Sequence, residues 1–127
     1  MKLAALNLPI AKKWFDMIAS EKKREEYRDA TNRQCARLYN EAVWRNGGVL
    51  PDGLAAIFRN GYRMDSPALA VRLVGISIRS GDMAAHPEWG EPKSNRSHFV
   101  LKLGKIISVG SYNDIKTKML KAQGKSK

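Results

Sequence analysis

The stretch that decides the fold is SEKKREEYRD, residues 20–29, where acidic and basic side chains alternate closely. If these residues continue a helix, Lys22 and Glu26 form an i,i+4 pair on a solvated face. If they form a strand, Arg24, Glu26 and Arg28 share one face, because alternate side chains of a strand point the same way. The other face then carries the intervening residues, Glu25, Tyr27 and Asp29.

The flanking sequence favours the strand. Residues 9–20, PIAKKWFDMIAS, place apolar side chains at helical spacing, with Pro9 suited to the first turn of a helix. Residues 31–34, TNRQ, fit a capping box in which Thr31 caps a new helix and Gln34 reaches back. A helix that begins at Thr31 requires the chain to change direction after Ser20. We therefore expect a helix, a charged strand and a second helix that ends near Gly47.

The remaining sequence predicts strands. Residues 2–9 form a short apolar segment, and Asn60-Gly61 is the typical signal of a two-residue hairpin. Two alternating runs, 68–80 and 98–110, change the parity of their apolar positions at Gly75 and Gly104. A parity change at glycine indicates a β-bulge, and bulges curve a sheet toward closure. The fold class predicted is α+β, a small barrel or strongly bent sheet with two or three flanking helices.

The length of 127 residues suggests a single core. We predict a barrel domain over residues 1–110 and a basic C-terminal helix or tail over 111–127, with Ser111 capping the helix. No apolar run reaches the ~20 residues of a membrane span. With one cysteine, Cys35, and two histidines, an intrachain disulfide is excluded and structural zinc is disfavoured. No cofactor is predicted, and the expected location is cytoplasmic.

The charge of the chain is strongly basic. The formal net charge is +11, and removing the five lysines of residues 116–127 still leaves +6 on the body. Because basic surfaces bind polyanions through phosphate contacts and counterion release, this charge favours a nucleic-acid partner.

The charged stretch also resembles a family motif. Read as Glu21-x-Lys23-x-x-Glu26-x-Arg28, it is similar to Gly-x-Lys-x-x-Glu-x-Arg of the ASCH superfamily, with glutamate in place of the glycine. The segments FRNGY and HFVLKLGKI look like later strands of the same family, so the resemblance runs from Leu3 to about Val109. It implies a small PUA-like β-barrel that binds RNA in a cleft beside the motif. Whether Glu21 preserves the tight turn before the strand is left open.

The motif residues are candidates for catalysis. Some relatives in the family remove the acetyl group from acetylcytidine nucleosides with the motif lysine, a threonine and a distant glutamate; others are linked to cleavage of single-stranded RNA. Here Glu26 occupies the position of the threonine, which counts against an identical mechanism. Lys23 and Glu26 would be two proton carriers if burial lowers the pKa of the lysine. The alternative is an ion-pair network that closes one end of the barrel.

Other residues suit nucleic-acid binding, because aromatic side chains among cations stack unpaired bases and contact phosphates. The predicted set is Arg28, Arg59, Tyr62, Arg63, Trp89, Lys93 and Arg96. Two alternatives stay open: Tyr62 packs at a barrel rim, and Trp89 caps the core. Cys35 is predicted to be a core residue, and His98 is predicted not to be catalytic.

The sequence therefore predicts an ASCH-type protein that binds RNA or nucleotides, single-stranded or modified, around Lys23, Glu26 and Arg28. An enzyme is the first alternative, either an amidohydrolase similar to those acting on acetylcytidine or a ribonuclease. A protein-interaction adaptor with an acidic partner is the second. No membrane partner is expected, and the oligomeric state is not predicted.

Overall fold

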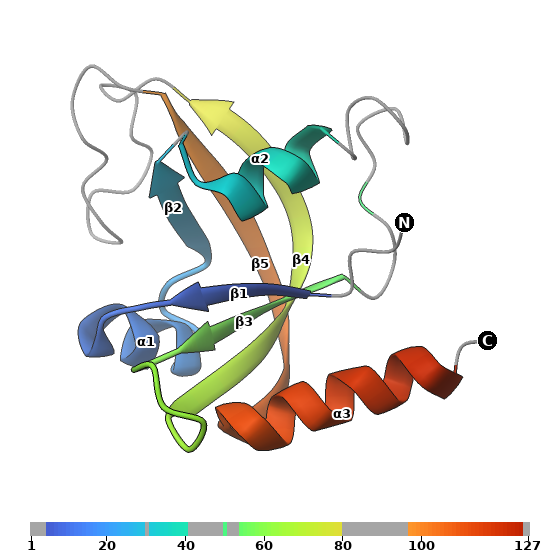
Figure 1. Ribbon diagram of the computed structural model, residues 1–127. Helices are drawn as coiled ribbons and strands as arrows, with labels where there is room; N and C mark the ends of the chain where they lie inside the picture. The colour runs from blue at the N-terminus through green and yellow to red at the C-terminus, as the bar shows by residue number, and fades with distance from the viewer. Residues whose placement is uncertain (1–4, 30, 41–49, 51–53, 80–96, 126–127) are drawn as a thin grey trace.

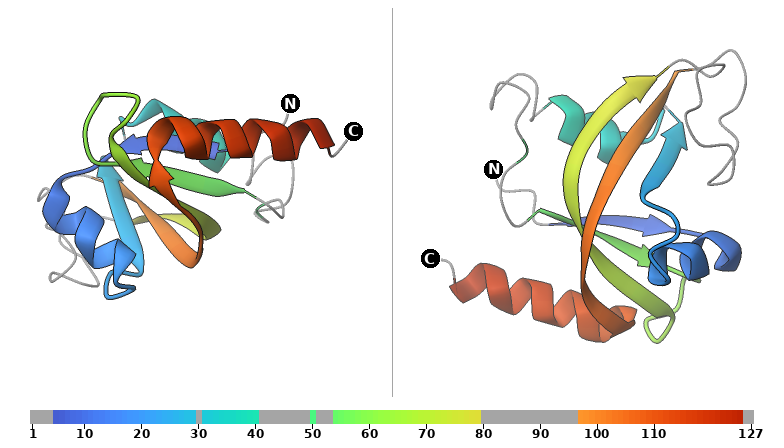
Figure 2. Two further views of the ribbon diagram at one scale, coloured as in Figure 1. Left: turned by 90° about the horizontal axis from the view of Figure 1, so that it is seen from below. Right: turned by 180° about the vertical axis from the view of Figure 1, so that it is seen from behind.

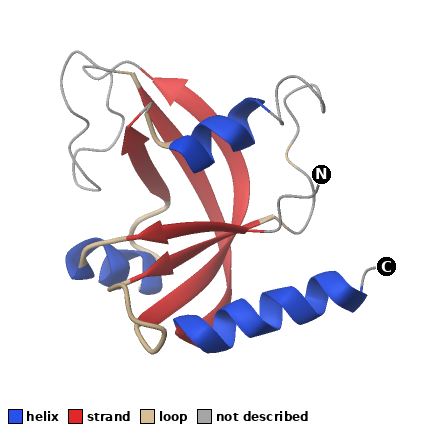
Figure 3. Cartoon of the chain, in the orientation of Figure 1, coloured by secondary structure: helices blue, strands red, loops and turns tan. Residues whose placement is uncertain are grey.

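The computed structural model describes residues 5–29, 31–40, 50, 54–79 and 97–125. Within these residues, three helices and five strands follow one another (Figures 1 and 3). Their order is β1 (Ala5–Pro9), α1 (Lys12–Ala19), β2 (Glu25–Asp29), α2 (Arg33–Asn40), β3 (Ala55–Arg59), β4 (Pro67–Arg79), β5 (His98–Ser111) and α3 (Tyr112–Lys125). The predicted α+β class and the strand interpretation of residues 25–29 are confirmed. None of the described helices has the length and apolar character needed to span a membrane.

The five strands form one curled sheet in the order β1-β3-β4-β5-β2. β1 runs parallel to β3, and all other neighbours are antiparallel. β4 and β5 are long and bend strongly along their length (Figures 1 and 2). Their register shifts between Ala70 and Val71, again before Leu73, and again before Gly75. The last two shifts lie at Gly104 of β5 and at Gly75 of β4, where the apolar parity changes, so the predicted bulges are confirmed. The sheet curls into a half-barrel (Figure 1).

The inner face of the half-barrel holds the main hydrophobic core. Apolar side chains of β1, β3, β4 and β5 meet there, and α1 and α2 contribute Ile18, Cys35 and Leu38. α3 packs on the opposite face of the sheet, where its buried Tyr112 and Ile115 form a second apolar cluster. The members that the sheet contributes to this second cluster are Ile57, Ala68 and Ala70.

Side chains complete the edge of β1. The carboxamide of Gln34 accepts a hydrogen bond from the Asn7 N–H at 2.8 Å and donates one to the Asn7 carbonyl at 2.7 Å. Farther along, Arg28 donates to the Pro9 carbonyl at 2.9 Å. Pro9 has no N–H to leave unpaired, which suits it to an edge. We call the gap between edge strands β1 and β2 the seam, and Arg28 bridges it.

Three local predictions are wrong. Asn32 caps α2 instead of Thr31, because its Oδ1 accepts from the Cys35 N–H at 2.9 Å, while Gln34 is used at β1. Pro9 ends the first strand, as predicted for residues 2–9, but α1 begins at Lys12, so the place of Pro9 in the first turn of the helix is wrong. The β3–β4 connection spans residues 60–66, not two residues, and Gly61 adopts a φ of 124° within it. The predicted cap at Ser111 is confirmed by its hydrogen bond from the Asp114 N–H.

Candidate functional site

The turn before β2 ends α1 and places the motif. The Glu21 N–H donates to the Ile18 carbonyl at 3.0 Å, and the Lys22 N–H donates to the Met17 carbonyl at 2.9 Å. This pair of hydrogen bonds is the Schellman motif, whose first residue beyond the cap is left-handed and usually glycine. Glu21 takes that conformation with a φ of 63°. The tight turn is therefore kept although glutamate replaces the motif glycine.

Lys23 follows this turn and is enclosed. Its side chain is 1% exposed, and its Nζ lies 3.2 Å from Glu26 Oε1. The rings of Trp14 and Tyr27 flank the ammonium, with centroids 5.2 Å and 4.9 Å from Nζ. Burial lowers the pKa of Lys23 below its usual 10.5, and the Glu26 carboxylate opposes that shift.

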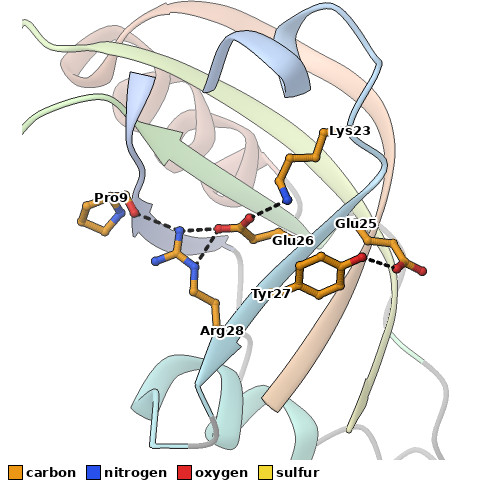
Figure 4. Close-up of polar contacts among 6 residues, drawn as sticks. All are labelled: Pro9, Lys23, Glu25, Glu26, Tyr27 and Arg28. Atoms are coloured by element: carbon orange, nitrogen blue, oxygen red, sulfur yellow. Dashed lines mark hydrogen bonds and ion pairs between the residues drawn. The ribbon is translucent and has the colours of Figure 1, made fainter. Parts of the chain in front are cut away.

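Glu26 and Arg28 point to the inner face of the sheet, as the strand interpretation predicted. They pair in register with Leu101 and Phe99, which belong to the core. Arg28 reaches Glu26 Oε2 through Nη2 at 2.7 Å and through Nε at 2.9 Å. Figure 4 shows the resulting chain from Lys23 through Glu26 and Arg28 to the Pro9 carbonyl. Lys23 and Arg28 thus both contact the Glu26 carboxylate in a largely buried setting.

Arg28 is the accessible member of this chain. Its side chain is 18% exposed, against 7% for Glu26 and 1% for Lys23. The described contacts of its guanidinium use Nε and Nη2 and do not involve Nη1. A ligand oxygen would therefore meet Arg28 before it met Lys23.

A second polar group lies on the opposite face of β2. The Tyr27 hydroxyl donates to Glu25 Oε1 at 2.9 Å, and Arg79 Nη1 lies 3.5 Å from the same oxygen. The ring of His98 meets Tyr27 edge-on, with centroids 5.8 Å apart. His98 is 4% exposed, and neither of its ring nitrogens has a hydrogen-bond partner among the residues that the structure describes. The sequence analysis assigned no function to this group. The signal in the sequence was that Glu25 and Tyr27 alternate with the motif residues Glu26 and Arg28 along β2, and so lie together on the other face.

Apart from Arg28, the predicted nucleic-acid contacts divide into two sets. Arg59 ends β3 in register with Pro9, and Tyr62 and Arg63 follow in the next turn. Tyr62 is 83% exposed, so the rim-packing alternative for it is wrong. The second set, Trp89, Lys93 and Arg96, lies outside the described residues. Glu88 and Glu91, the later acids of the sequence that could correspond to the distant glutamate of the amidohydrolase relatives, lie outside them as well.

Two further residues bear on the chemistry. Trp14 was predicted only as part of the apolar face of a helix. Nothing in the sequence around Trp14 indicated that its ring lies beside the ammonium of Lys23. Cys35 is fully buried, and burial raises its pKa to about 12, which agrees with a core role and not with a nucleophile. Within the described ranges, no three His, Cys, Asp or Glu side chains gather as metal ligands would.

A curled five-stranded half-barrel with three helices defines a class, the small α+β fold of PUA-like and ASCH proteins. The particular likeness is to a mutant form of ZmASCH from Zymomonas mobilis, with a TM-score of 0.55. The alignment covers 91% of this chain and 79% of that one at 8% sequence identity, so it establishes the ASCH fold alone. No family model matches the sequence, and no curated protein matches it.

Proposed function

We propose that the protein is an ASCH-type domain that binds RNA or nucleotides at a site built around Lys23, Glu26 and Arg28. The observation that carries the proposal is the pair of cations on one buried carboxylate at the seam. Because water screens charges less at a largely buried site, these two cations interact with an anionic group more strongly than an exposed lysine does. The net charge of +11 favours the same class of partner.

The three side chains have different parts in this site. Arg28 contacts the ligand, because a planar guanidinium suits phosphate and carbonyl oxygens, and its contacts with other described residues do not use Nη1. Glu26 orients Arg28 through two hydrogen-bonding nitrogens. Lys23 contacts the other oxygen of Glu26, so each oxygen of this buried carboxylate has a cation beside it. This division follows the order of exposure along the chain from Lys23 to Arg28.

The test compares RNA affinity at several salt concentrations. Arg28→Gln is expected to weaken binding of a short single-stranded RNA and to lower the slope of log K against log salt by about one. Lys105→Gln is the matched control, since Lys105 is an exposed cation elsewhere on β5. Circular dichroism of both variants checks that the fold is retained. Equal losses in both variants would show that only the overall charge binds RNA, and the site would be withdrawn.

A hydrolase is the second candidate, favoured by one observation. The lowered pKa of Lys23 beside Glu26 suits a group that transfers protons. Against it, both oxygens of Glu26 already contact cations and Lys23 is enclosed. Turnover of acetylcytidine or short RNA that disappears in both Lys23→Ala and Glu26→Gln would support the enzyme. Indifference to every nucleic acid, with capture of an acidic protein, would support an adaptor.

A further inference from the structure

The turn over residues 60–66 presents large side chains to solvent. Tyr62 is 83% exposed and Met64 is 51% exposed. The Arg63 side chain between them is 85% exposed. Single exposed apolar residues are ordinary, but here three consecutive large side chains are exposed at one turn.

Arg59 holds this turn from within. Its Nε donates to the Gly61 carbonyl at 3.0 Å, and its Nη2 donates to the Arg63 carbonyl at 2.9 Å. The guanidinium carbon lies 3.6 Å from the centroid of the Tyr112 ring, which is 6% exposed. Arg59 is therefore a positioning residue of the turn, although the sequence pointed to it as a nucleic-acid contact.

The start of α3 holds the turn from the other side. The Tyr112 N–H donates to the Ser66 carbonyl and the Asn113 N–H donates to the Met64 carbonyl, each at 2.8 Å. Inside the turn, Ser66 Oγ accepts from the Arg63 N–H at 3.0 Å. A Cβ at Gly61 would come within 2.7 Å of that Oγ, so the turn is close-packed as well as hydrogen-bonded.

A fixed backbone with exposed side chains is the arrangement of a preorganised binding surface. Little backbone entropy is lost when such a turn binds, and tyrosine adds contact area with only two rotatable side-chain torsions. The charges nearby are mixed. Arg63 faces Asp65 at 3.2 Å in an exposed ion pair, which contributes little and is easily exchanged for a phosphate. Lys116 lies 6.0 Å from the Tyr112 ring, on the α3 side of the turn.

We propose that the turn is a base-stacking platform for single-stranded RNA: Tyr62 stacks an unpaired base and Arg63 contacts the adjoining phosphate. An unpaired base is required, because the faces of paired bases are already stacked in a duplex. The inference rests on the proposed function and extends it to a second contact. Arg59 and Pro9 end the paired strands β3 and β1, and Pro9 accepts the hydrogen bond of Arg28. The platform and the Arg28 site therefore lie at the same end of these strands (Figure 1).

Because the Arg28 site and the platform are distinct, a short and a long ligand are expected to make different contacts. A mononucleotide engages Arg28 alone, whereas an oligonucleotide contacts both Arg28 and the platform. Fluorescence anisotropy with a labelled oligouridine, and calorimetry with a mononucleotide, measure the two affinities. Tyr62→Ala is expected to weaken oligouridine binding roughly 5- to 150-fold, the range of one lost base stack. Its affinity for the mononucleotide is expected to be unchanged.

Matched variants make the result specific. Tyr62→Phe keeps the ring face and is expected to retain oligouridine affinity, as is Val109→Ala, which shortens an exposed apolar side chain on β5. Arg59→Lys keeps the charge but loses the forked hydrogen bonds. Arg59→Lys is expected to weaken the binding of oligouridine and to leave the binding of the mononucleotide unchanged. Hydrogen exchange at the amides of residues 61–66 is expected to become faster.

Several outcomes would overturn the platform. If the protein binds oligouridine and Tyr62→Ala does not change the affinity, the platform is wrong and the proposed function stands. A loss in Tyr62→Phe equal to that in Tyr62→Ala would assign the effect to the hydroxyl and not to stacking. If the unaltered protein binds neither ligand, the proposed function and the platform fail together.

Discussion

Glu21 stands in a left-handed backbone conformation, at a φ of 63°, where a side chain crowds the carbonyl that follows it. The hydrogen bonds of the Schellman turn hold it there. Glu21→Gly removes the Cβ and leaves those hydrogen bonds intact. We expect the free energy of unfolding in urea to rise by about 1 kcal/mol. Ser20→Gly is the control: Ser20 has a φ of −87°, so glycine there relieves nothing and stability should fall.

The lowered pKa of Lys23 predicts that the free energy of unfolding depends on pH. Its pKa in the folded protein is lower than its usual 10.5, so between those two values the unfolded chain holds a proton that the folded chain has lost. In that window stability rises with pH, and below it Lys23 contributes no slope. We compare urea unfolding of the natural protein and Lys23→Met from pH 7 to pH 10. The stability of the natural protein relative to the variant should increase toward the alkaline end. A decrease would mean that Glu26 outweighs burial and raises the pKa.

His98 is buried, and within the described part of the chain neither of its ring nitrogens has a hydrogen-bond partner. A buried polar group without a partner destabilises the folded state by about 1–3 kcal/mol, and an apolar group of similar size avoids that penalty. We therefore expect His98→Leu to keep or raise the free energy of unfolding. Tyr27→Phe provides the contrast, because it removes the hydrogen bond to Glu25 and should lower stability by about 1 kcal/mol. A large loss in His98→Leu would indicate a partner for the imidazole.

At the scale of elements, β1 depends on side chains for part of its pairing. The Gln34 carboxamide replaces a neighbouring strand at Asn7, with one hydrogen bond in each direction. Gln34→Ala should lower stability by about 1 kcal/mol and speed hydrogen exchange at the Asn7 amide. The Ile10 amide, which donates to the Arg59 carbonyl, is the internal reference and should exchange as before. Equal acceleration at both amides would indicate global loosening and not loss of an edge contact.

These elements also show what the sequence could and could not predict. The faces of β2 followed from alternation alone, because strand parity is a local property, and the bulges followed from glycines within apolar runs. The capping box at Thr31 failed because Gln34 finds its partner at Asn7, far away in the sequence. The turn after Arg59 was misjudged for a similar reason, since its shape depends on α3. Trp14 looked like any core position of a helix until the fold brought Lys23 beside it.

At the scale of the whole molecule, the site exists because the sheet stops short of closing with backbone pairs. The Arg28 guanidinium spans the seam to Pro9, and the same side chain is the exposed cation of the polar chain. A structural role and the proposed binding role thus fall on the same residue, so ligand measurements, and not burial, decide whether Arg28 also binds. Stability and affinity of Arg28 variants therefore need to be measured together.

Whether α3 and the sheet unfold together as one cooperative unit is a testable question. The division at residue 110 is a prediction, yet Ile115 of α3 is fully buried in the cluster on the outer face of the sheet. If α3 and the sheet unfold as one unit, Ile115→Ala should lower the free energy of unfolding by about 2–5 kcal/mol, the usual loss for such a truncation in a core. Circular dichroism and near-ultraviolet spectra should report the same transition. Lys118→Ala, at an exposed position of the same helix, should stay within about 0.5 kcal/mol of the natural protein. Loss of helical signal in Ile115→Ala with an unchanged transition for the sheet would instead mark residues 111–127 as an independent segment.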